Sequence, residues 1–165
     1  VEEEEARRLT AERKKTGFVD WDAVEKVVGK EAADQMKQGE GFTGTLNLGN
    51  KSITAEGCRT IAPALRTMPN LKTLWLYNNN IGDEGLAVLS NVVSAIPLLD
   101  YLRLADNKIG NVGCQCLLEL VENDSLQSLT WLDLNRNRNI SSEELKTKVK
   151  RVWSEKGKKT NYLTI

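Results

Sequence analysis

The stretch Leu71-Lys-Thr-Leu74-Trp-Leu76-Tyr-Asn-Asn79-Asn-Ile81-Gly-Asp-Glu-Gly85 decides the fold, because its pattern returns along the chain. It recurs as Leu99-Asp-Tyr-Leu102-Arg-Leu104-Ala-Asp-Asn107-Lys-Ile109-Gly-Asn-Val-Gly113 and, in shorter form, as Leu129-Thr-Trp-Leu132-Asp-Leu134-Asn-Arg-Asn137. A weaker copy stands earlier, with Leu46, Leu48, Ile53 and Gly57. Successive copies of the Leu-x-Leu pair are 28, 28 and 30 residues apart. A fixed period in this range is typical of a solenoid.

Each repeat changes from strand periodicity to helix periodicity. Leu-x-Leu alternates buried and exposed positions, which predicts short strands near residues 45–48, 73–76, 101–104 and 131–134. The Asn three positions after the second Leu suits the strand exit, because its amide can satisfy backbone groups of a turn. Apolar residues at helical spacing follow, and they predict one helix per repeat. These residues are Cys58, Ile61 and Leu65, then Leu86, Leu89 and Val93, then Cys114, Leu117 and Val121; Met68, Ile96 and Leu126 should close each core.

With these motifs the chain resembles the leucine-rich-repeat family, and its frame looks most like the ribonuclease-inhibitor type. The frame L-x-x-L-x-L-x-x-N-x-I-x-x-x-G, with a period near 28, covers about residues 42–145. The resemblance implies an α/β solenoid, a right-handed horseshoe arc with parallel strands on the concave face and helices on the convex face. Lys51 replaces the turn Asn of the first repeat, and an extra residue places Ile140 one position late. Both departures lie in terminal repeats, which are usually atypical.

The segments that flank the repeats predict helical caps. Before the repeats, a loosely helical apolar face would cover the first repeat, with Asp20 or Asp22 as the N-cap. Its members are Phe18, Trp21, Val24, Val28 and Met36. We therefore expect an N-terminal helical cap or linker over residues 1–41 and four repeats over 42–140.

A C-terminal helical cap is expected over residues 141–165. Ser141–Glu144 reads as a capping box that opens a helix, and the apolar face of that helix would hold Leu145, Val149, Val152 and Trp153. The final Tyr162–Ile165 repeats the Leu-x-Leu rhythm. It predicts either a closing strand or the point at which a longer array was cut.

The composition excludes most common catalytic schemes. The chain has no histidine, so it lacks a Ser-His or Cys-His dyad, an imidazole base and a His-ligated metal. The three cysteines, with Cys114 and Cys116 as a lone C-x-C, complete neither a disulfide framework nor a zinc site. They are expected to be packing thiols in a reducing compartment. The sequence predicts no enzyme activity, no cofactor and no metal.

Charge and hydropathy limit the expected partners. The 23 basic and 23 acidic residues balance, which argues against nucleic acid as the partner. No apolar run approaches the roughly 18 residues of a membrane span, and nothing resembles a signal peptide. We expect a cytoplasmic, intracellular protein without a membrane or small-molecule partner. Because the chain begins at Val1, we expect a piece of a longer protein or a trimmed product.

Two charged runs stand at the ends of the chain. Glu2–Glu5 and the basic residues that follow predict a solvated helix with opposed charges, or alternatively a coiled-coil contact. The C-terminal basic residues are expected to complement a helix dipole, or alternatively to touch phosphate or an acidic surface. They are Lys146, Lys148, Lys150, Arg151, Lys156, Lys158 and Lys159.

Strand alternation turns the residues between the leucines toward the concave face. They should form three columns across the strands. The first holds Thr45, Thr73, Tyr101 and Trp131, with Tyr162 as a further candidate. The second holds Asn47, Trp75, Arg103 and Asp133, with Thr164 as a further candidate. The third holds Gly49, Tyr77, Ala105 and Asn135.

Six concave residues form the predicted partner-binding site: Trp75, Tyr77, Tyr101, Arg103, Trp131 and Asp133. Trp, Tyr and Arg are the residue types enriched in interface hot spots. We expect Arg103 to stack on Trp75 and to pair with Asp133, while Tyr101 lies beside Trp131. The alternative is that these rings only cover neighbouring strands.

The sequence thus predicts a non-catalytic protein–protein interaction module, a scaffold or adaptor that binds another protein through its concave face. Two other classes stay open. The repeat type is also similar to that of Ran GTPase-activating proteins, which implies an enzyme regulator, although a short array with an aromatic inner face fits that role poorly. The third class is a structural segment of a large cytoskeletal or ciliary assembly.

Overall fold

The computed structural model describes residue 4 and residues 17–165. The strands are β1 (Thr45–Asn47), β2 (Thr73–Trp75), β3 (Tyr101–Arg103), β4 (Trp131–Asp133) and β5 (Leu163–Thr164). The helices are α2 (Trp21–Val28), α3 (Lys30–Met36), α4 (Ala55–Leu65), α5 (Gly82–Val93), α6 (Asn111–Glu122) and α7 (Glu143–Glu155). Short 3₁₀ turns cover Gly39–Gly41 and Thr160–Tyr162.

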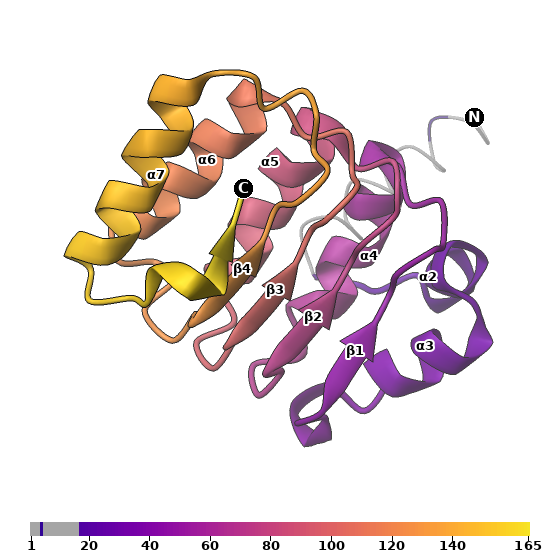
Figure 1. The fold of residues 1–165 in the computed structure, drawn as a ribbon. Coiled ribbons are helices and arrows are strands. Elements are labelled where there is room, and N and C mark those ends of the chain that lie inside the picture. Colours follow the sequence, from indigo (N-terminus) through magenta and orange to yellow (C-terminus); the bar gives the residue numbers. More distant parts are fainter. Residues whose placement is uncertain (1–3, 5–16) are drawn as a thin grey trace.

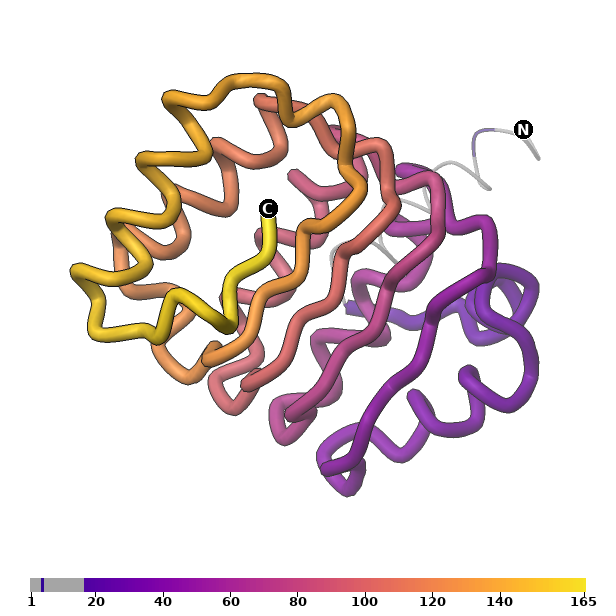
Figure 2. Tube along the Cα trace, in the orientation of Figure 1, coloured from indigo at the N-terminus to yellow at the C-terminus, as the bar shows by residue number. Residues whose placement is uncertain are grey.

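Strands and helices alternate to give a curved, two-layered coil. All strands are parallel and lie in one sheet in the order β1-β2-β3-β4-β5. The strands line one side of the coil, and α4 to α7 lie behind them on the other side (Figure 1). The tube in Figure 2 shows each turn of the coil beside the next, from the indigo N-terminal end to the yellow C-terminal end. The structure is therefore an α/β solenoid of the leucine-rich-repeat type, as the sequence predicts.

The repeated leucines hold the strands in register. Leu46, Leu74, Leu102 and Leu132 are paired across successive strands, and Leu163 extends this row into β5. All of them are buried, and so are the predicted helical triplets and Met68, Ile96 and Leu126. The positions of the first four strands and the inward leucines are thus confirmed, and the final residues form a fifth strand.

The turn asparagines link neighbouring repeats as well as their own turns. Asn137 donates through Nδ2 to the carbonyls of Leu104 (2.9 Å) and Leu134 (2.8 Å). Its Oδ1 accepts from the backbone N–H groups of Asn107 (2.9 Å) and Ile109 (3.0 Å), which belong to the preceding repeat. An amide suits this place because it both donates and accepts.

This arrangement explains why the first repeat tolerates Lys51 in place of Asn. Asn79 of the second repeat accepts from the backbone N–H groups of Lys51 (3.0 Å) and Ile53 (2.9 Å). An Asn at position 51 would have no earlier repeat to serve. The departure is therefore a consequence of being first in the array.

The second repeat turns differently from its neighbours. Asn79 N–H donates to the Asp106 carbonyl (3.2 Å) and Gly82 N–H to the Asn107 carbonyl (2.9 Å), rather than to the Asn107 side chain. Gly82 has a φ of 60°, and α5 begins at this residue, one position earlier in its repeat than α4 and α6. Consequently Oδ1 of Asn107 is buried without a hydrogen-bond partner among the described residues.

Polar side chains also cap helices across repeats. Asp83 Oδ1, in the first turn of α5, accepts from Gly110 N–H (2.7 Å) and Gly113 N–H (2.9 Å) at the start of α6. Asn111 Oδ1 repeats this role one turn later and accepts from Ser141 and Ser142. The second and third repeats thus satisfy N–H groups at the start of the next helix.

The N-terminal apolar face belongs to two helices rather than one. Gly29, with a φ of 83°, separates α2 from α3. Val24, Val28 and Met36 are buried and Trp21 is partly buried against the core, whereas Phe18 is half exposed. Of the two N-cap candidates it is Asp20, whose side chain accepts from Ala23 N–H at 3.0 Å. The expectation for the charged run that begins at Glu2–Glu5 lies outside the described residues, apart from Glu4.

The C-terminal helix packs its predicted face inward, but it is capped one residue later than expected. Ser142, not Ser141, accepts from Leu145 N–H at 3.1 Å. Val149, Val152 and Trp153 are buried.

Much of the C-terminal basic run is used within the fold. Ion pairs join Lys146 to Glu143, Lys148 to Glu122, Arg151 to Glu155 and Lys156 to Asp124. The Lys158 ammonium donates to the carbonyls of Leu126, Gln127 and Leu129, and burial lowers its pKa. The last turn of α7 carries no basic residue, and the basic residue at the C-terminal end of this helix is its C-cap, Lys156.

Candidate functional site on the concave face

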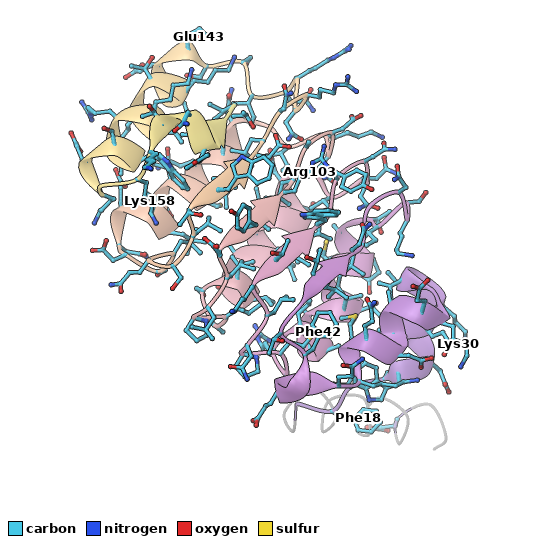
Figure 3. All side chains as sticks on the ribbon, turned by 60° about the horizontal axis from the view of Figure 1, so that its bottom comes forward. Phe18, Lys30, Phe42, Arg103, Glu143 and Lys158 are labelled. Atoms are coloured by element: carbon cyan, nitrogen blue, oxygen red, sulfur yellow. The ribbon has the colours of Figure 1, made fainter. Side chains whose placement is uncertain are left out.

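The predicted columns stand on the concave face with the expected register. Across the sheet, Thr73 is the register partner of Tyr101, and Tyr101 is the register partner of Trp131. Trp75, Arg103, Asp133 and Thr164 form the neighbouring row. Tyr162 does not join the first column as a strand residue, since it lies in a 3₁₀ turn. Figure 3 shows Arg103 over the middle strands of the sheet, away from the labelled residues at either end.

Arg103 stacks on Tyr77, not on Trp75 as predicted. Its guanidinium carbon lies 4.6 Å from the centre of the Tyr77 ring. That ring rests against Gly49, where a methyl group would lie 2.5 Å from Cε1 and Cζ of the tyrosine. The missing side chain of Gly49 gives the ring the space it occupies, and this places the ring under the guanidinium.

The predicted pair between Arg103 and Asp133 is present. Arg103 Nε donates to Asp133 Oδ2 at 3.2 Å. The other carboxylate oxygen, Oδ1, accepts from Thr164 Oγ1 at 2.6 Å and from Asn135 N–H at 3.0 Å. Asp133 is buried, with its side chain only 11% exposed, whereas that of Arg103 is 41% exposed. Asp133 therefore holds the arginine in place from the neighbouring strand.

A row of side-chain contacts consequently crosses the whole sheet. It runs from Gly49 after β1 through Tyr77, Arg103 and Asp133 to Thr164 in β5. We call these five residues the cross-sheet row. Because each member fixes the next, the exposed guanidinium is held in a defined orientation before any partner arrives.

Four aromatic residues of the concave face, Tyr77 among them, form two edge-to-face pairs. Tyr101 and Trp131 have ring centres 5.5 Å apart at an angle of 89°. Trp75 and Tyr77 have centres 6.4 Å apart at 62°. Tyr101 is 39% exposed, and the other three rings are half-buried. The predicted contact of Tyr101 with Trp131 is confirmed, and the structure brings all six predicted residues together.

Sequence reasoning did not assign Gly49 and Thr164 to the site. Both were placed in the columns, but neither has a side chain that suggests binding. The available signal was positional, since a glycine beside an aromatic residue in one column leaves room for the ring. Likewise, a hydroxyl beside Asp133 in the next strand is within reach of a carboxylate.

Gly49→Ala should disrupt the row without removing any polar group. The added methyl group would push the Tyr77 ring away and separate it from Arg103. We expect the free energy of unfolding to fall by about 1–3 kcal/mol, the usual cost of overpacking. The ring-current shift of the Arg103 Nε–H signal in NMR spectra should also diminish.

Gly44→Ala is the matched control for this change. A methyl group there would meet the Phe42 ring at 3.6 Å, an ordinary contact distance. The control should leave the Arg103 signal unchanged. An unchanged signal in Gly49→Ala as well would show that Gly49 does not set the position of Tyr77.

The cysteines are built as packing thiols. Burial raises the pKa of Cys58 to about 12 and that of Cys114 to about 11, and Cys116 is raised for the same reason. All three are unpaired. Thiols with such raised pKa values are protonated near neutral pH and therefore poor nucleophiles.

Over residue 4 and residues 17–165, no three Cys, Asp or Glu side chains gather into a group that would hold a metal ion. Within the same described part of the chain, none of the helices combines the length and apolar character needed to span a bilayer.

The regular alternation of parallel strands and outer helices, with a buried leucine pair in each unit, defines the class of repeat solenoids. A family model described as leucine-rich repeat matches residues 67–90 and 96–118. These matches cover β2 and β3 with most of the helices that follow them. The chain is a leucine-rich-repeat protein. A comparison with curated proteins gave no match.

Leucine-rich repeats are generally protein-interaction modules, and the family is typically non-catalytic. Their extended concave surface is suited to contact another macromolecule. In this chain that surface carries the aromatic pairs and the cross-sheet row.

Proposed function

We propose that this protein is a non-catalytic scaffold or adaptor that binds a protein partner through its concave face. Trp75, Tyr77, Tyr101, Arg103 and Trp131 form the contact surface, and Asp133 positions Arg103 from the neighbouring strand. The observation that carries the proposal is the ordered packing of two aromatic pairs on one face, with an arginine held between the Tyr77 ring and Asp133.

The energetics of binding favour such a surface. Association costs side-chain freedom, roughly 0.5–1.5 kcal/mol for each mobile side chain that becomes fixed. Here Tyr77 and Arg103 already hold each other, and Tyr101 is already packed on Trp131. These side chains are already ordered in the folded protein, so fixing them adds little to the free-energy cost of binding a partner.

Exposed apolar residues elsewhere are more scattered. Phe18 precedes α2, Leu98 lies in the turn before β3, and Val112 is in the first turn of α6. Single exposed apolar residues are common on monomeric proteins, whereas contiguous groups mark interaction surfaces. The concave cluster is therefore the preferred site.

The test is the double variant Trp75→Ala with Arg103→Ala. With a partner isolated by affinity to the full chain, each residue should contribute at least about 2 kcal/mol as a hot spot. This corresponds to roughly a thirtyfold increase in Kd for each single variant. Isothermal titration calorimetry measures the change, and thermal melting checks that the variant still unfolds cooperatively.

Val112→Ala with Lys150→Ala is the matched control on the helical side. It also removes one exposed apolar residue and one exposed cation. We expect its affinity to equal that of the unchanged chain. Retained binding by the concave variant, together with weakened binding by this control, would move the site to the convex face.

We also propose the division into an N-terminal cap over 1–41, repeats over 42–140 and a C-terminal cap over 141–165. Buried residues in α2, α3 and α7 support the two outer assignments.

A cytoplasmic location is proposed because the free cysteines suit a reducing compartment. The repeat period supports the ribonuclease-inhibitor type.

A further inference from the structure

We propose that the loops leaving β3 and β4 form a second site, which binds an acidic peptide segment of a protein partner. The loops enclose a cleft of about 540 Å³ lined by Asp106, Lys108, Arg136, Arg138 and Asn139. We call it the strand-exit cleft. It goes beyond the proposed contact on the concave face and can be tested separately.

The loop backbone explains why these side chains gather at one place. Asn137 ties the two loops together by accepting from the backbone N–H groups of Asn107 and Ile109. Asn139 adds a link, since its amide donates to the Lys108 carbonyl at 3.4 Å. Arg138 lies in the stretch that the extra residue of the fourth repeat lengthens. These hydrogen bonds hold the two loops together and involve none of the basic side chains that line the cleft.

The residues that line the cleft carry a net positive charge, with three cations and one carboxylate. Lys108, Arg136 and Arg138 are exposed, and Asp106 is the one carboxylate lining the cleft. None of these four forms an ion pair with another of the residues that the structure describes. By contrast, Lys146, Lys148, Arg151 and Lys156 all have acidic partners. In a chain of zero net charge, this local excess points to an anionic ligand.

The composition of the cleft favours carboxylates of a peptide over a polyanion. Nucleic acid binding depends on a wide basic stripe that neutralises many phosphates. The cleft has three cations, and Asp106 among them would repel a dense row of phosphates. Asn139 and Asp106 instead provide hydrogen-bonding groups that suit a peptide carrying one or two acidic residues.

The position of the cleft fits a ligand that is part of a protein. Arg136 directly follows Asn135, the last member of the third concave column. A partner that lies across the concave face would therefore reach the cleft without leaving the surface. Charges at the rim of an interface mainly raise the association rate and select the partner.

The experiment uses the full chain and a fluorescently labelled Gly/Ser peptide that carries two glutamates, with binding followed by anisotropy. The site variant combines Lys108→Gln, Arg136→Gln and Arg138→Gln. The control combines Arg66→Gln, Lys72→Gln and Lys150→Gln, which removes the same charge from exposed positions elsewhere. We expect the site variant to bind the peptide roughly tenfold more weakly and the control to change by less than about twofold.

Competition separates the sources of negative charge. Inorganic phosphate and an oligothymidylate should displace the labelled peptide only at higher concentrations than the same peptide without the label. The proposal is overturned by absent peptide binding, by equal weakening in both variants, or by tighter binding of phosphate or oligothymidylate. Trp75→Ala with Arg103→Ala leaves the cleft residues in place, so we expect this variant to bind the peptide as tightly as the unchanged chain. The peptide experiment therefore tests the cleft independently of the proposed contact on the concave face.

Discussion

Deleting residues 1–40 is expected to abolish the cooperative unfolding transition and to cause aggregation. The described part of this segment buries Val24, Val28 and Met36 beside the first repeat. Each buried side chain of this size contributes about 1.5–3 kcal/mol. A domain is typically stable by only about 5–15 kcal/mol, so the loss removes a large part of the total. Differential scanning calorimetry and light scattering measure the two effects.

The reason lies in how a solenoid ends. α2 packs on α4, and α3 packs on β1. Without these helices, Leu46, Leu48 and the inner face of α4 would meet water at the open edge of the array. Deletion of residues 1–16 is the control, because it keeps α2 and α3. A cooperative transition with an unchanged midpoint after deletion of residues 1–40 would show that the segment is only a linker.

Leu104→Ala is expected to lower the free energy of unfolding by about 2–5 kcal/mol through the cavity it leaves. Leu104 is fully buried between neighbouring repeats, and its N–H donates to the Asp133 carbonyl at 2.8 Å. The strands above and below are fixed by the same ladder, so the site has little freedom to collapse. Urea unfolding followed by circular dichroism measures the change.

Leu98→Ala gives the matched comparison, since it removes the same atoms from a side chain that is 45% exposed. Its cost should stay below about 1 kcal/mol, because much of the deleted surface is already in water. Equal effects of the two substitutions would contradict the assignment of Leu104 to the repeat core.

Much of the fold could be predicted because the repeat multiplies a weak local signal. One Leu-x-Leu pair is common in any protein, but four in register also specify which neighbours meet across the sheet. This is why the pairing of Tyr101 with Trp131, and of Arg103 with Asp133, was predictable from spacing alone. The contacts of Asp83 with Gly110 and Gly113 were missed because an Asp in a first helical turn already suits its own helix.

The details of the candidate site depended on side-chain direction, which register does not determine. The columns placed Trp75 directly beside Arg103, yet Arg103 stacks on Tyr77, whose ring occupies the space that Gly49 leaves open. The hydrogen bond from Thr164 to Asp133 required the final residues to form a strand, which the sequence left as one of two alternatives.

The claim that the concave face binds a protein is tested most directly by site-specific photo-crosslinking in the complex with an isolated partner. A benzophenone side chain at Tyr101, which is 39% exposed on the concave face, is compared with one at Val112, which is 68% exposed on α6. We expect a crosslink from position 101 and none from position 112, with the crosslink lost when Trp75→Ala and Arg103→Ala are added. A crosslink from position 112 alone would contradict binding through the concave face.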